Sequence, residues 1–181
     1  MKTQSGFALI PLIVILTLAG LGLYWYLSRS SPTPNPLAGW QTYRNEEYGF
    51  EVKYPNNFSY DNSAGGIIAF DKKEIFENGG CNQGFGSPFC GITLELFSKS
   101  SNIEAAVRDI PLSPEVLLSE SKSRILGGNK FIVVKRFYRQ EPSQFQMFYF
   151  IESSQSIFEF FVQSNYEKTA DQILSTFKFV K

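Results

Sequence analysis

The chain has 181 residues, of which 43% are hydrophobic and 16% aromatic. This composition is far from the charge-rich, apolar-poor signature of disorder, so we expect a folded domain. Basic and acidic side chains number 17 each, and no overall field favours nucleic acid as a partner. The chain has no His, which excludes Ser-His-Asp and Cys-His catalytic systems.

The first predicted element is an apolar helix over residues 7–27, a stretch of 21 residues without charge. At about 1.5 Å per residue, such a helix matches a hydrocarbon core of about 30 Å. A cleavable signal usually has a shorter apolar core, and the aromatic end of this stretch, from Tyr24 to Tyr26, is typical of a membrane interface. We therefore expect a single-pass transmembrane helix after a short cytoplasmic leader at 1–6, with a cleaved signal as the alternative.

The flanking charges give the helix an orientation. Lys2 precedes it and Arg29 follows it, which gives a slight preference for a cytoplasmic N-terminus. Residues 28–39 form a Pro/Ser-rich linker, because closely spaced prolines disfavour helix and favour an extended tether. The domain at 40–181 is then expected outside the cytoplasm.

The start of the chain also resembles the signal of type IV pilins and pseudopilins. In that family a short polar leader ends in Gly, cleavage leaves a following Phe, and an apolar stem begins, an order that Gly6 and Phe7 match. Pro11 stands where the family usually carries Glu, and the prolines of the linker interrupt the stem. A minor pilin-like or pseudopilin-like structural component is therefore kept as an alternative function.

Alternating apolar residues predict strands in the first half of the domain. The alternation over 48–54 ends at Pro55, a second short strand is expected over 67–71, and a third over 91–98. The strand at 48–54 is expected to be half-buried, because its apolar residues alternate with Gly49, Glu51 and Lys53.

A helix is predicted over 101–110, where apolar residues recur at helical spacing. Ser101 and Glu104 have the spacing of a capping box, and Pro111 ends the helix. The segment "EVLL" at 115–118 is expected to form a further short turn of helix.

The sequence of the second half of the domain predicts antiparallel hairpins followed by a helix. Short turns separate the strands, and parallel neighbours would need long crossovers. The last strand is apolar on both faces, so we expect helices to cover the sheet on both sides. The final helix is expected to be capped by Ser164 with Glu167. The predicted strands are 121–126, 130–139, 145–152 and 156–164. The fold class is therefore α+β, with a mostly antiparallel sheet of about six or seven strands covered by helices.

Two segments carry a family resemblance. The opening "YRNEEYGFEVKYPNNF" at 43–58 and the ending "ADQILSTFKFV" at 170–180 resemble the PsbP-like superfamily, named for the extrinsic P protein of photosystem II. The resemblance covers about 40–181 and implies an α/β/α sandwich. It also implies a binding module, since family members mostly dock to larger protein assemblies rather than catalyse reactions.

Cys81 and Cys90, the two cysteines of the chain, bracket the Gly-rich segment "CNQGFGSPFC". We expect a disulfide between them, which would persist outside the cytoplasm; two buried free thiols are the alternative. A zinc site is not expected, because the chain has no His and two Cys only. Phe85 and Phe89 are candidate partner contacts, or they fold back onto the sheet.

Three strand carboxylates, Glu95, Glu152 and Glu159, are the available candidates for acid/base chemistry. We expect them to be solvated or ion-paired, and likewise expect the basic residues between Lys122 and Arg139 to form a solvated strand face. The sequence predicts no catalytic residue, cofactor, metal or small-molecule substrate; a Ser-Lys hydrolase is the enzymatic alternative. The leading hypothesis is a single-pass bacterial cell-membrane protein whose outer domain docks to another envelope protein.

Overall fold

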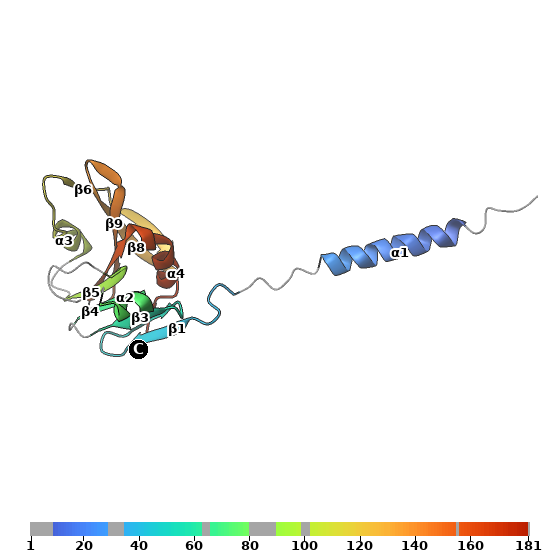
Figure 1. The fold of residues 1–181 in the computed structure, drawn as a ribbon, viewed down its shortest axis with the longest axis horizontal. Coiled ribbons are helices and arrows are strands. Elements are labelled where there is room, and N and C mark those ends of the chain that lie inside the picture. The colour runs from blue at the N-terminus through green and yellow to red at the C-terminus, as the bar shows by residue number, and fades with distance from the viewer. Residues whose placement is uncertain are drawn as a thin grey trace, which may run out of the picture. The chain divides into compact units, whose positions relative to one another are not determined.

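The computed structural model describes residues 9–28, 35–62, 66–79, 90–98, 102–154 and 156–180. The chain divides into two units, Met1–Ala38 and Gly39–Lys181 (Figure 1). The first contains helix α1 (Leu9–Leu27), which confirms a helix where the sequence predicts one. Among the helices of the described residues, none combines the length and the apolarity needed to cross a membrane.

The Gly39–Lys181 unit is built on two antiparallel sheets. The large sheet has eight strands in the order β3–β4–β5–β10–β9–β8–β6, and β7 also pairs with β8. The small sheet has the order β1–β2–β11. The strands of the large sheet are β3 (Phe58–Asp61), β4 (Ile67–Lys72), β5 (Ile92–Ser98), β6 (Val116–Leu118), β7 (Lys122–Leu126), β8 (Asn129–Tyr138), β9 (Glu141–Glu152) and β10 (Ser156–Gln163). Those of the small sheet are β1 (Gln41–Asn45), β2 (Phe50–Tyr54) and β11 (Lys178–Phe179).

The predicted hairpins of the second half are confirmed. The turn between β7 and β8 is formed by Gly127 and Gly128, with Leu126 opposite Asn129 in the register. Both glycines have positive φ, 56° and 88°, which a tight hairpin turn of two residues requires. Because β7 pairs with the first half of β8 and β6 with the second half, the two short strands share one edge of β8.

The large sheet is buried on both faces, as its apolar strands predict. On one face, here called the α4 face, Phe131, Tyr149 and Phe160 pack against α4 (Glu167–Leu174) and the small sheet. The opposite α3 face packs against α3 (Ile103–Arg108). Its buried residues on the sheet include Val134, Phe148, Phe150, Ile157 and Phe161.

The expectation that helices alone cover the sheet is wrong. On the α4 face, much of the cover is the small sheet, whose Phe50 and Val52 are fully buried in the same core. β11 pairs with β2, so residues from the two ends of the domain form one sheet. Local periodicity does not reveal a pairing between residues that are so far apart in the sequence. The large sheet also has more strands than the predicted six or seven.

Three local predictions also differ from the structure. Residues 116–118 form strand β6, because they pair with β8 rather than closing a helical turn. The N-cap of α3 is Asn102, whose side chain accepts a hydrogen bond from the Ala105 N–H at 2.8 Å. The predicted cap at Ser164 is instead the start of a 3-10 turn, η1 (Ser164–Tyr166), that precedes α4 without a side-chain cap bond. Helix α2 (Lys73–Glu77) had no sequence prediction.

Candidate functional site

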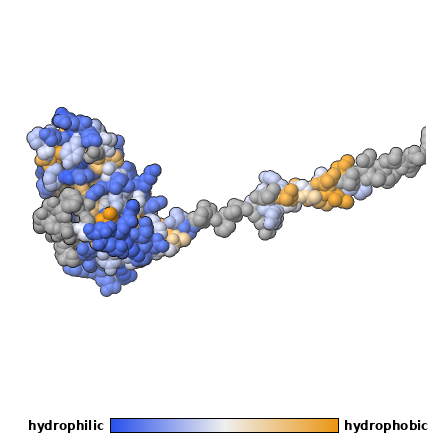
Figure 2. Space-filling model, viewed as in Figure 1, coloured by the Kyte–Doolittle hydropathy of each residue, from blue (hydrophilic) through white to orange (hydrophobic). Residues whose placement is uncertain are grey.

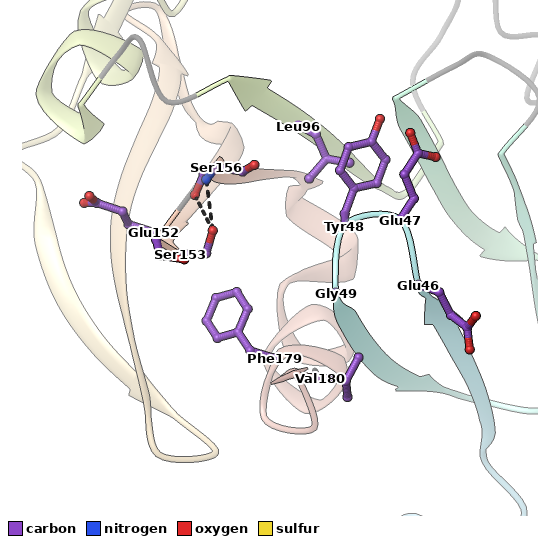
Figure 3. A pocket seen from close by; sticks show the side chains of 11 residues that line it. Glu46, Glu47, Tyr48, Gly49, Leu96, Glu152, Ser153, Ser156, Phe179 and Val180 are labelled. Carbon is purple, nitrogen blue, oxygen red and sulfur yellow. Dashed lines mark hydrogen bonds between the residues drawn. The ribbon is translucent and has the colours of Figure 1, made fainter.

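The Gly39–Lys181 unit has an open pocket of about 990 Å³ on its surface. The β1–β2 turn with Tyr48 forms one wall, the β9–β10 turn forms the other, and Phe179 of β11 lies between them (Figure 3). The carboxylates of Glu46, Glu47 and Glu152 lie around its margin. The pocket thus combines an aromatic floor with an acidic rim.

A second pocket of about 720 Å³ shares Phe179 and Glu152 with the first. Its far end reaches α3 at Glu104 and the β7–β8 hairpin at Lys130. Its apolar lining comes from Ile103, Val107, Ile132 and Ile151. The two pockets therefore meet at Phe179, and we refer to them together as the groove.

The walls of the groove are fixed by tight backbone contacts. Gly49 has φ of 65°, and a Cβ at this position would lie 2.9 Å from the Val180 carbonyl oxygen. The Val180 N–H donates to the Gly49 carbonyl at 2.8 Å, which joins the β1–β2 turn to the C-terminal segment. Across the groove, the Ser156 N–H donates to Ser153 Oγ at 2.9 Å and closes the β9–β10 turn. The groove is therefore preformed, because each wall is held by its own hydrogen bonds.

Phe179 is the exposed aromatic of the floor, at 43% of its accessible surface. Its ring meets those of Phe177 and Phe158 edge-on, with centroids 5.1 Å and 5.7 Å away. Both of these partners are fully buried. The core thus holds the Phe179 ring in place while one side of it faces the groove.

The three candidate carboxylates lie at two separate sites. Glu152 lies at the groove, whereas Glu159 and Glu95 face each other across β10 and β5 on the α3 face. Glu159 is 9% exposed, and among the described residues it has no hydrogen-bond or ion-pair partner. The expectation that Glu159 is solvated or salt-bridged is therefore wrong.

Burial sets the protonation of this pair. Desolvation, together with the charge of Glu95, raises the pKa of Glu159 to about 8, and Arg136 opposes the shift. Partial burial also raises the pKa of Glu95. Arg136 does not pair with Glu159, because its guanidinium donates to Gln146 Oε1 and to the Pro111 carbonyl. Glu159 is consequently mostly protonated at neutral pH.

On the α4 face, by contrast, a half-buried carboxylate is matched by hydrogen-bond donors. Asp171 of α4 accepts from Arg124 Nη1 at 2.8 Å and from the Tyr149 hydroxyl at 2.9 Å. Arg124 also reaches Glu167 at 3.4 Å. Burial and the Asp171 carboxylate raise the pKa of Tyr149, so its hydroxyl remains a donor. This network joins α4 to β7 and β9.

A second matched carboxylate, Asp71, lies at the end of β4. It is 4% exposed and accepts from the Gly91 N–H at 2.8 Å, from the Lys72 N–H at 2.7 Å and from the Tyr166 hydroxyl. A Cβ on Gly91 would lie 2.4 Å from the Tyr166 ring, so this approach requires glycine. Asp71 thereby fixes the start of β5 against η1.

The remaining predicted site residues lie in or beside a part of the chain that the structure does not describe. Cys81, Phe85 and Phe89 are outside the described residues, so the partner contact stays a prediction. Cys90 is described, is 5% exposed and packs with Ala69. The Cys81–Cys90 disulfide likewise stays a prediction.

The basic residues between Lys122 and Arg139 are not one solvated face. Arg124 is engaged with Asp171, and Arg136 lies over the Phe148 ring at 5.2 Å. Lys135 Nζ lies 4.0 Å from the Phe145 ring centroid. The prediction of a solvated face is wrong for these three residues, because strand alternation turns their side chains onto aromatic or acidic partners.

Comparisons with known proteins support the fold. No family model matches the chain, and no curated protein matches it. A crystal structure from Bacteroides thetaiotaomicron VPI-5482 has a TM-score of 0.53 at 12% identity, covering 79% of this chain and 49% of that one. The chain therefore spans about half the length of that protein, and the likeness shows a shared fold only.

A second solved structure belongs to the family that the sequence resembles. It is the solution structure of cyanobacterial PsbP (CyanoP) from Synechocystis sp. PCC 6803, with 12% identity and a TM-score of 0.43. The match covers 83% of this chain and 98% of that one. The predicted α+β class with mostly antiparallel sheets is confirmed by the strand pairing itself.

Proposed function

We propose that this protein is a membrane-anchored binding module of PsbP-like type that docks to another envelope protein through its groove. The observation that carries the proposal is the preformed groove, in which a fixed, exposed Phe179 lies within a rim of glutamates. An aromatic anchor surrounded by polar residues is typical of protein contact surfaces. Elsewhere on the Gly39–Lys181 unit, the described surface in view is mostly hydrophilic (Figure 2).

The anchor is the second part of the proposal. Although no described helix has the properties of a span, residues 7–27 carry no charge, and α1 exposes large apolar side chains. Ile13 and Leu21, for example, are 58% and 64% exposed. Surfaces of this kind are usually covered by a partner or by lipid. We place the helix in the cell membrane, with the N-terminus in the cytoplasm and the domain outside.

Site-specific photo-crosslinking in native membranes tests the docking. A photoreactive amino acid at Tyr48, on the groove wall, should give a discrete crosslinked partner band. The same group at Thr42, an exposed position of β1 outside the groove, is the matched control and should give none. Equal crosslinking from both positions, or from neither, would contradict docking through the groove.

The anchor needs its own measurement. After alkaline carbonate washing, the full chain should stay with the membrane and be released by detergent. Protease added to intact spheroplasts should digest the 40–181 domain. Release by carbonate, or protection of the domain from protease, would contradict the proposed placement.

The pilin-like alternative is favoured by the order of Gly6 and Phe7 at the start of the chain. Sequencing the mature N-terminus separates the two functions. A chain that begins at Phe7 supports the pilin pathway, whereas a chain that retains Lys2 supports the permanent anchor.

A further inference from the structure

From the lining of the groove we infer that its occupant is an extended segment of the partner protein, with an apolar side chain flanked on both sides by Lys or Arg. This inference rests on the proposed function and adds the chemistry of the partner. It follows from where the charges and the apolar floor lie along the groove.

The charges lie toward both ends. Glu46 and Glu47 line one pocket, and Glu104 lines the other. Among the described lining residues, Lys130 is the one basic side chain. The whole chain has a net charge of +0, so this excess of negative charge belongs to the groove. An acidic groove favours a cationic occupant and disfavours an anionic lipid surface.

The nearby ion pair does not remove this excess. Arg44 Nε lies 3.6 Å from Glu46, and the Glu46 side chain is 83% exposed. Exposed pairs of this kind contribute about 1 kcal/mol or less, so a partner cation can compete for Glu46. Glu47 and Glu104 are also exposed on the rim.

The apolar floor lies between the charges. Phe179 lines both pockets, the first together with Leu96 and Val180 and the second together with Val107 and Ile132. A single apolar side chain of the occupant would contact Phe179, and residues before and after it would then point toward opposite ends of the groove. An extended segment advances about 3.3 Å per residue, so about nine residues would reach about 30 Å. This arrangement calls for cations on both sides of a central apolar residue.

A peptide titration on the purified full chain in non-ionic detergent tests the inference. The probe is a fluorescent peptide of about nine residues with Lys at alternate positions and a central Phe. We expect it to bind about tenfold more tightly than the same peptide with Glu in place of Lys, and to weaken severalfold between about 50 and about 500 mM NaCl. A peptide with Ser in place of the central Phe should also bind more weakly.

Variants of the groove locate the binding. The double substitution Glu47→Gln and Glu104→Gln should weaken binding of the Lys peptide at least about threefold, since it removes one rim charge at each end. Glu77→Gln on α2 is the matched control, because Glu77 is exposed and lies outside the groove. Binding unchanged by the double substitution, or equal binding of the Lys and Glu peptides, would overturn the inference.

The two proposals can fail separately. A partner crosslinked from Tyr48 without preference for the Lys peptide would retain the docking function and reject the cationic segment. A membrane-bound or self-associated chain that yields no groove crosslink would reject both.

Discussion

The two faces of the large sheet give an acidic side chain opposite surroundings. On the α4 face, Asp171 receives hydrogen bonds from Arg124 and Tyr149. On the α3 face, Glu159 is more deeply buried than Asp171 but has no such partner among the described residues. A second carboxylate, Glu95, lies opposite it. The first acid is matched by two hydrogen-bond donors, whereas burial drives the second to the protonated form.

This difference shows which contacts hold the domain together. A carboxylate that accepts several hydrogen bonds can link elements that are distant in sequence. Asp171 links α4 to the large sheet in this way. A buried carboxylate without hydrogen-bond partners links no elements, and it destabilises the folded state when it is ionised. Glu159 should therefore link the stability of the fold to pH.

The largest effect is expected for the pH dependence carried by Glu159. Its folded-state pKa of about 8 lies above its unfolded value, so the folded state binds the extra proton between these two values. Stability should fall as pH rises from about 4.5 to about 8, by up to about 1.4 kcal/mol per pH unit and about 4 kcal/mol in total. Glu159→Gln should remove this decline and make the protein more stable at pH 8. The measurement is urea unfolding of wild type and variant across this pH range, with Glu77→Gln as control.

A parallel fall of stability with pH in the wild type and Glu159→Gln would show that another group controls it. Burial of Glu159 on the α3 face would then not explain the pH dependence of stability.

The next largest effect is expected at Asp71. Asp71→Ala leaves the buried Gly91 N–H and the Tyr166 hydroxyl without their acceptor. The free energy of unfolding should fall by about 3 kcal/mol, as measured by chemical denaturation at pH 7. Glu74→Ala, at an exposed position of α2, is the control and should change it by less than about 0.5 kcal/mol.

A smaller loss is expected at Asp171, because its network is partly exposed. Asp171→Ala should destabilise the domain by about 2 kcal/mol, since hydrogen bonds to a charged group are lost. A double-mutant cycle with Arg124→Ala should show positive coupling of about 1 kcal/mol. Additive effects at these two positions would mean that the short Arg124–Asp171 contact contributes nothing.

The smallest effect on stability is expected in the groove. Glu47→Gln should change the free energy of unfolding by less than about 0.5 kcal/mol, because the side chain is exposed and has no structural role in the contacts described. The same substitution combined with Glu104→Gln should nevertheless weaken peptide binding. A stability loss comparable to that of Asp171→Ala would indicate that the rim supports the fold rather than binding.

The sequence predicts much of the fold, because strand alternation and tight turns are local signals. The strands at 67–72, 92–98 and 156–163, and the Gly127–Gly128 turn, follow from these signals alone. The pairing of β11 with β2 does not, since two residues near the end of the chain carry no periodicity. Strand β2 lies within the predicted strand at 48–54, but its pairing with β11 and its share of the cover do not follow from local signals.

The candidate site could be predicted only in part. Glu95, Glu152 and Glu159 are recognisable as strand carboxylates, but their burial depends on which strands become neighbours. The groove depends on Phe179 lying beside the β1–β2 and β9–β10 turns, which are far apart in sequence. Phe179 is the one residue of the sequence that could have indicated the groove. Residue spacing, however, does not distinguish an exposed Phe from a core Phe.

Hydrogen–deuterium exchange of the full chain with the Lys peptide tests the central claim, docking through the groove, most directly. The account predicts slower exchange at residues 46–49, 152–154 and 178–180 when the peptide is bound. It predicts no change at 136–141, the far end of the β8–β9 hairpin, which does not line the groove. Protection confined to 136–141, or no protection at the groove at saturating peptide, would contradict it.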